Sequence, residues 1–193
     1  MASVTSKTPS ASLSLRPLLL LAGVIPAVLV GLDQLSKWAT TRLFNQPMSF
    51  CADRSLNLPK ELVDYELSPL VDIHLICNRG ISWGMLQGDS SLKRWGLTIF
   101  AFLMTVALIY VLRKTHDRLG QISLSLVIAG AVGNAIDRLF FGAVTDMIDF
   151  SDIGFNYVFN VADSYITVGV IGLFISSYIN EKREKAAAKA AAE

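Results

Sequence analysis

The sequence predicts an all-α integral membrane protein with four transmembrane helices and a small β-containing domain on the outer side of the membrane. Three observations favour this fold class. The chain of 193 residues is 52% hydrophobic and only 17% charged, and its mean hydropathy of +0.48 lies outside the usual range of soluble proteins. Four apolar runs are each long enough to cross a bilayer. A proline-containing segment of mixed charge separates the first run from the second.

The four predicted helices span about 17–44, 95–112, 121–141 and 163–180. The apolar start of the first helix could pass for a signal-peptide core, but the chain continues as DQLSKWATTRLF instead of a small-residue cleavage site. In this continuation Asp33 and Lys37 stand four residues apart, with the acid first, which places them on one helix face. We expect a mutually neutralising pair at the membrane boundary, and a kink at Pro26.

The remaining segments divide by composition. Residues 17–180 are predicted to form a single membrane-embedded catalytic domain, flanked by a disordered cytoplasmic leader (1–16) and a cytoplasmic tail (181–193), with an outer domain at about 45–93 and a catalytic loop at 142–162. In the outer domain the stretch LVDIHLICN alternates between apolar and polar residues, which predicts a half-buried strand. Cys51 and Cys77 lie in the same domain, either as a disulfide or as two unpaired small apolar residues.

The orientation follows from the basic residues. Lys and Arg occur in the leader, in the turn at 113–118 and in the tail, whereas 142–162 contains neither. By the positive-inside rule both termini are cytoplasmic, and the outer domain and the acidic loop share the outer face. This topology places five polar residues at one depth near the outer edge of the hydrocarbon: Asp33, Asn78, Arg138, Asp146 and Asp163.

Several function classes are disfavoured. A formal net charge of +1 argues against nucleic acid as a partner. Ser82 lies in a G-x-S-x-G pattern, but the nucleophile elbow that this pattern marks needs an α/β sheet, and the chain has no βαβ pattern. The two histidines, His74 and His116, fall outside the predicted helices, which disfavours an intramembrane serine protease or a zinc protease. No spacing typical of metal ligands is present, so we predict neither a metal nor a cofactor.

Carboxylates gather between residues 133 and 166. The five acids of this segment are Asp137, Asp146, Asp149, Asp152 and Asp163. A carboxylate near a bilayer is costly unless it is paired, faces water or serves a function. Two aspartates held close together share one proton, so that one can act as general base on a water and the other as acid on a carbonyl. This chemistry needs no cofactor.

Three of the five acids have simple structural explanations. Asp137 directly precedes Arg138, and we expect it to compensate the charge of that arginine. Asp149 and Asp152 stand among polar neighbours, and we expect both to be solvated loop acids.

The other two acids form the candidate pair. Asp146 lies in the apolar context AVTDMI, which would raise its pKa. Asp163 follows Asn160 at the spacing of an N-cap and the third residue of a helix, and a helix start favours a carboxylate. The alternative is a small transporter or scaffold whose aspartates bind ions or protons, but that function predicts polar residues near the bilayer midplane, and the helix centres here are apolar.

Five sequence blocks, in this order, resemble lipoprotein signal peptidase, the bacterial type II signal peptidase: DQLSK (33–37), NRGISWG (78–84), GNAIDR (133–138), VTDMIDF (144–150) and FNVADSYI (159–166). The resemblance implies an intramembrane aspartic endopeptidase with four helices and a small outer β-domain. Such an enzyme removes the signal peptide from prolipoproteins and cuts just before a cysteine that carries diacylglycerol. It implies residence in the bacterial cytoplasmic (inner) membrane, contact with membrane lipid, an active site near the outer face, and a monomer.

The same resemblance assigns roles to residues. By motif position the catalytic aspartates are Asp146 and Asp163. The residues that it implies as site-supporting or substrate-binding are Asn134, Asp137, Arg138, Asn160, Asp33, Lys37, Asn78 and Gly80. Met147 departs from the family pattern, which usually has Phe after the first catalytic aspartate.

Overall fold

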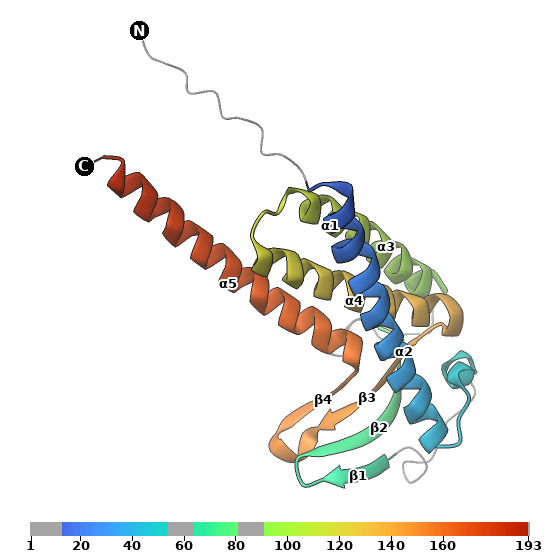
Figure 1. Cartoon of the computed structure of the whole chain (residues 1–193). Coiled ribbons are helices and arrows are strands. Elements are labelled where there is room, and N and C mark those ends of the chain that lie inside the picture. The colour runs from blue at the N-terminus through green and yellow to red at the C-terminus, as the bar shows by residue number, and fades with distance from the viewer. Residues whose placement is uncertain (1–12, 54–63, 81–90, 193) are drawn as a thin grey trace.

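The computed structural model describes residues 13–53, 64–80 and 91–192. Within these ranges, four helices are long and apolar enough to cross a membrane, and a four-stranded antiparallel sheet lies against one end of the helix bundle (Figure 1). The predicted class, four membrane helices with a small β-containing part, is confirmed.

The first spanning helix is continuous but irregular. It comprises α1 (Leu15–Leu19), the π-helical segment η1 (Leu20–Val24) and α2 (Ile25–Leu43). Pro26 follows the π-helical segment directly. Proline has no N–H to donate, and its ring crowds the carbonyl one turn earlier, so the wider turn accommodates it. The kink at Pro26 stays a prediction, and the feature that the structure shows there is the π-helical segment before it.

The other spanning helices are α3 (Ser91–Lys114), α4 (Arg118–Phe141) and α5 (Val161–Ala190). Each extends beyond its predicted bounds, and α5 continues through most of the predicted tail because Ala, Lys, Arg and Glu favour helix. Asp117 caps α4 by accepting a hydrogen bond from the backbone N–H of Gly120 at 2.7 Å, and it accepts another from Ser176 Oγ of α5 at 2.6 Å. The turn between α3 and α4 is thereby attached to α5.

Glycines bring α4 and α5 together backbone to backbone. A Cβ added at Gly133 would lie 3.3 Å from Ala162 Cβ, and one added at Gly169 would lie 2.7 Å from the carbonyl oxygen of Ser123. The tract AGAVGNA of α4, whose small residues favour close helix approach, supplies Gly130 and Gly133 to this seam.

The sheet has the order β1-β2-β3-β4, with strands β1 (Asp64–Ser68), β2 (Val71–Asn78), β3 (Val144–Phe150) and β4 (Phe155–Phe159). The predicted strand is β2, which pairs with β3 so that Ile76 stands opposite Asp146. The sequence predicts a loop at 142–162. That prediction is wrong for its central part, where β3 and β4 form an antiparallel hairpin. Gly142, with φ of 82°, ends α4 in the left-handed conformation and turns the chain into β3.

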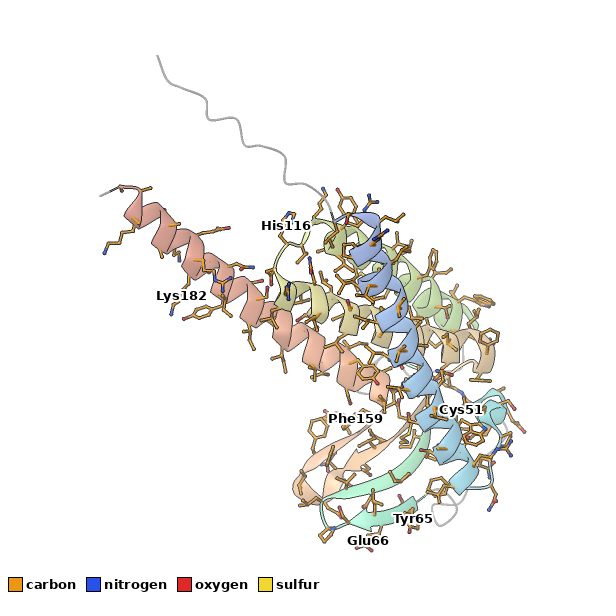
Figure 2. The ribbon with its side chains drawn as sticks, in the orientation of Figure 1. Cys51, Tyr65, Glu66, His116, Phe159 and Lys182 are labelled. Atoms are coloured by element: carbon orange, nitrogen blue, oxygen red, sulfur yellow. A yellow bond between two sulfur atoms is a disulfide. The ribbon has the colours of Figure 1, made fainter. Side chains whose placement is uncertain are left out.

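A disulfide resolves the two alternatives for the cysteines. Cys51, in the short helix η2 (Met48–Ala52), is bonded to Cys77 of β2. Cys51 is only 1% exposed and packs with Phe50 and Leu75 where the sheet meets the end of α2 (Figure 2). The bridge joins the chain after the first membrane helix to the sheet.

The helices carry large apolar side chains on their outward faces. Phe100 is 62% exposed, Phe102 66% and Phe174 73%, as expected for surfaces that contact lipid instead of water. The first spanning helix begins, and α5 ends, at the side of the bundle that is opposite the sheet (Figure 1).

Candidate active site

Asp146 and Asp163 come from different elements and are connected through Asn160. Asp146 lies in the middle of β3, and Asp163 is the third residue of α5. Asn160 is the N-cap of α5: its Oδ1 accepts a hydrogen bond from the backbone N–H of Asp163 at 2.9 Å, as its spacing predicts. Its Nδ2 donates to Asp146 Oδ1 at 2.6 Å. One side chain thus starts the helix of one aspartate and holds the carboxyl group of the other.

Two further asparagines complete the arrangement. Asn78 Nδ2 donates to Asp146 Oδ2 at 2.9 Å, and the backbone N–H of Gly80 fixes that amide by donating to Asn78 Oδ1 at 3.0 Å. Asn134 Nδ2 donates to Asp163 Oδ1 at 2.8 Å. Each aspartate is therefore held by an asparagine of its own as well as by the cap. Four residues from the predicted set, on β2, α4 and the loops, converge here.

The environment of Asp146 favours its protonated form. The side chain is 2% exposed. Burial, followed by the negative charge of Asp163, raises the pKa of Asp146 to about 7, against the opposing effects of its two amide donors and of Lys37. The apolar sequence context predicts this direction. The influence of Asp163 shows that the negative charge of one member of the pair acts on the carboxyl group of the other.

Arg138 is not paired with Asp137, which corrects the expectation from their adjacency. Its Nη2 donates to the carbonyl oxygen of Gly80 at 2.8 Å, and its Nη1 donates to that of Asn134 at 3.4 Å. Consecutive residues of a helix point in different directions, so neighbours in the sequence do not face each other.

Asp137 contacts Lys37 instead. Lys37 Nζ lies 2.8 Å from Asp33 Oδ2 and 2.8 Å from Asp137 Oδ2, and all three side chains are fully buried. The predicted pair of Asp33 and Lys37 is confirmed, and the structure adds a second carboxylate from α4. Gln34, which no sequence motif marks as a site residue, donates to Asp137 Oδ1 at 2.8 Å and to Asp33 Oδ2 at 3.2 Å.

The two acids predicted to be solvated differ. Asp152 is exposed, as expected, in the short helix η4 (Ser151–Ile153). Asp149 is only 8% exposed, so the prediction that it is a solvated loop acid is wrong. It lies on the inner strand β3, where its carboxylate accepts from the backbone N–H of Ser151 at 2.8 Å and lies 3.6 Å from His74 Nδ1. Because Asp149 is three residues from Asp146, the pleat points the two side chains to opposite faces.

The groups that the disfavoured protease classes would need do not come together at this site. His116 lies in the turn between α3 and α4, at the end of the bundle away from the sheet (Figure 2). His74 contacts Asp64 at 3.3 Å on the sheet. Ser82 lies outside the described residues. In the ranges that the structure describes, no group of three or more His, Cys, Asp or Glu side chains is arranged to hold a metal.

Two apolar cavities open onto Asp163. The larger, about 660 Å³, lies between β4 and α5 and includes Phe155, Phe159 and Thr167 in its lining. The smaller, about 300 Å³, lies among α3, α4 and α5, and Arg138 contributes to its wall. The site is therefore reached by apolar spaces from two sides.

Comparison with known proteins identifies the family. The model of the signal peptidase (SPase) II family matches residues 25–179. A lipoprotein signal peptidase of Methylobacterium sp. (strain 4-46) is 37% identical over 174 residues, which cover 90% of this chain and 97% of the relative. That of Caulobacter vibrioides is 37% identical over 166 residues, with 85% and 90% covered.

Solved structures with a similar fold are also found. Two structures of bacterial membrane enzymes resemble the chain, one with a TM-score of 0.67 and 27% identity, covering 91% of this chain and 96% of the other. The second has a TM-score of 0.62 and 28% identity, covering 88% and 97%. Since the family model spans all the residues of the asparagine-held pair and most of the chain, the protein belongs to the signal peptidase II family.

Proposed function

We propose that Asp146 and Asp163 are the catalytic pair of this enzyme. As a member of the signal peptidase II family, the protein is a protease that removes signal peptides from prolipoproteins. The observation that supports the pair is the shared cap: Asn160 binds Asp146 through its amide nitrogen and the start of the Asp163 helix through its oxygen. Family membership favours this function over the ion-binding transporter.

Asp163 acts as general base and Asp146 as general acid. Asp163 takes a proton from a water, whose oxygen attacks the carbonyl carbon of the scissile bond, while Asp146 gives its proton to the carbonyl oxygen. The tetrahedral intermediate then collapses: Asp146 takes back its proton, the carbon–nitrogen bond breaks, and the leaving nitrogen receives the proton from Asp163. The raised pKa of Asp146 supports its assignment as the acid. Each carboxyl oxygen has two lone pairs, so the bonds from the asparagines leave room for a proton or a water.

The cut falls just before the cysteine that carries diacylglycerol. This position follows from the family, and the surroundings of Asp163 support it. The cavities that reach Asp163 are lined mainly by apolar side chains, and both the signal helix and the acyl chains of such a substrate are apolar. Membrane lipid would occupy the same spaces when no substrate is present.

The enzyme resides in the bacterial inner membrane as a monomer, with its termini in the cytoplasm and its sheet and active site near the outer face. The basic residues that flank the helices support this orientation: Arg113, Lys114 and Arg118 lie at the turn opposite the sheet, and Lys182 lies beyond the middle of α5 (Figure 2). A disulfide on the sheet side supports it as well, because disulfides persist in oxidising compartments.

Cleavage of a lipidated precursor tests the catalytic pair. Asp146→Asn and Asp163→Asn keep the size of each side chain but remove the acid or base, and general acid–base catalysis contributes roughly 10²–10⁴-fold. We expect each variant to lose at least that factor in kcat. Asp152→Asn, an exposed acid of the same hairpin, is the matched control and retains full turnover. Wild-type rates in either folded pair variant would refute the assignment.

Labelling tests the orientation. Glu66 lies on β1, and Lys182 lies on α5 at the opposite side of the molecule (Figure 2). Because both native cysteines are bonded to each other, a single cysteine introduced as Glu66→Cys or Lys182→Cys is the only free thiol. A membrane-impermeant maleimide added to intact spheroplasts should label the first variant and not the second. The reverse pattern would invert the topology.

A further inference from the structure

Asp33 and Asp137 bind the backbone immediately before each of the two proposed catalytic residues. Asp33 Oδ1 accepts a hydrogen bond from the N–H of Ala162 at 2.9 Å, and Ala162 precedes Asp163. Asp137 Oδ2 accepts one from the N–H of Thr145 at 3.2 Å, and Thr145 precedes Asp146. Two carboxylates from two membrane helices thus each bind the backbone N–H one residue before a proposed catalytic aspartate, one on β3 and one on α5.

Lys37 holds these two carboxylates to each other. Its ammonium lies 2.8 Å from each, at full burial, and the amide of Gln34 donates to both. Gly133 leaves the space that this requires, because a Cβ there would lie 2.7 Å from Asp33 Oδ2. An unbroken series of polar contacts therefore runs from β3 through Asp137, Lys37 and Asp33 to the start of α5.

A buried cluster of this kind is costly to form. Two carboxylates against one ammonium leave unbalanced charge when all three are ionised, and desolvating even a balanced pair often costs more than the attraction returns. An apolar core would join α2 to α4 at lower cost. The backbone N–H groups of Thr145 and Ala162, however, need acceptors where β3 and α5 begin, and the two carboxylates supply them.

We propose that Asp33, Lys37 and Asp137 form a positioning triad that sets the separation and relative orientation of Asp146 and Asp163. The proposal rests on the proposed function of those two aspartates. The triad touches neither the substrate nor the reacting atoms. It acts through the peptide units before the pair, as a second connection between β3 and α5 beside Asn160.

Lys37 also acts on Asp146 through its charge. The charged groups that face Asp146 are Lys37 from α2, Arg138 from α4 and Asp163 from α5, while β2 contributes the neutral amide of Asn78. The positive charge of Lys37 lowers the pKa of Asp146 and so opposes the effect of burial. Removing the ammonium should therefore raise the pH at which Asp146 loses its proton.

Two substitutions test the triad with a lipidated fluorogenic peptide. Asp137→Asn removes one charge, keeps an oxygen for the N–H of Thr145, and leaves Asp33 and Lys37 as a neutral pair, so the variant should fold. A displacement near 1 Å of a catalytic group can cost about 10²-fold in rate. We expect kcat per folded enzyme to fall by about 10- to 100-fold on that basis, with KM within about twofold. Lys37→Met should lower kcat similarly and move the alkaline limb of the pH profile upward.

Asp117→Asn is the matched control. Asp117 also binds a backbone N–H and a side chain of another helix, but it does so at the end of the bundle away from the sheet. A purely structural role predicts that all three variants lose folded protein and that the remainder has wild-type kcat and pH midpoints. We expect Asp117→Asn to lose folded protein but to keep wild-type kcat and pH midpoints. We expect Asp137→Asn and Lys37→Met to change kcat per folded enzyme.

The outcomes are distinguishable. Wild-type kcat per folded enzyme in Asp137→Asn would overturn the triad, and this variant decides the matter if Lys37→Met does not fold. An equal fall of kcat in Asp117→Asn would also overturn it, since distance from the pair would then be irrelevant. Full activity of Asp146→Asn or Asp163→Asn would instead refute the proposed function, whatever the triad variants do.

Discussion

Gly130 lies where α4 passes the first turn of α5. Replacing it by alanine tests whether activity depends on the close contact between these two helices. The added Cβ would lie 2.6 Å from Ile166 Cγ1 and closer still to the carbonyl oxygen of Ala162. Ordinary van der Waals contact begins near 3.4 Å, so the contact with Ile166 is short by about 0.8 Å. Ile166 can change its rotamer. The carbonyl of Ala162 belongs to the helix that carries Asp163, and it can move only if the helix moves.

The magnitude follows from this geometry. Overpacking of this kind costs about 1–3 kcal/mol of stability, and a shift near 1 Å at the start of α5 should lower kcat by about 10²-fold. The two effects are measured separately, as the thermal unfolding midpoint in detergent and as the turnover of a lipidated peptide per folded enzyme. Because Ile166 lines both cavities, a change of its rotamer should alter KM as well.

Gly31→Ala is the matched control, because a Cβ at Gly31 of α2 would meet nothing within 4 Å. It should keep full turnover and gain up to about 1 kcal/mol from better helix propensity. If Gly130→Ala matched this control in both stability and turnover, α4 and α5 would not be in fixed contact at the site, and the reasoning would be wrong.

Three further predictions concern the bridge, the acid and the cap. Reduction of the bond between Cys51 and Cys77 should lower stability by about 2–4 kcal/mol, measured as the unfolding midpoint with and without reductant; an unchanged midpoint would contradict this. The pKa of Asp146 is raised from 3.8 to about 7, so activity should fall as pH rises through about 7. The proton on Asp146 also stabilises the fold: this contribution is complete below pH 3.8 and is lost as pH rises to about 7. Asp146→Asn should therefore flatten the dependence of the unfolding midpoint on pH. Asn160→Ala should remove about 1 kcal/mol of capping and also lower kcat, whereas a loss of stability alone would mean that its bond to Asp146 has no catalytic value.

The sequence predicts the membrane helices well because their signal is local. A run of some twenty apolar residues specifies a spanning helix by itself, and the spacing of Asn160 and Asp163 specifies a cap. The hairpin of β3 and β4 lacks such a signal. VTDMIDF does not alternate, because β3 is an inner strand whose first residues are buried on both faces, and it therefore resembles a loop.

Partners that lie far apart in the sequence were harder to predict. Lys37 and Asp137 are 100 residues apart, and nothing in either local sequence indicates that they meet. The pairing expected between Asp137 and Arg138 was excluded by helix geometry, since adjacent residues do not face each other. The burial of Asp149 also depends on a distant segment, because it pairs with β2. The residues around Asp149 in the sequence therefore predict a solvated acid.

The length of α5 has a consequence for the depth of the site. Thirty residues make a helix of about 45 Å at 1.5 Å per residue, whereas a bilayer core is about 30 Å thick. The first twenty residues, from Val161 to Asn180, match that thickness, and charges follow at Glu181, Lys182 and Arg183. Polar groups thus mark both ends of the spanning part, and each resists being drawn into hydrocarbon. The apolar part of α5 is therefore about as long as a bilayer core is thick, and Asp163 lies in the first turn of that part.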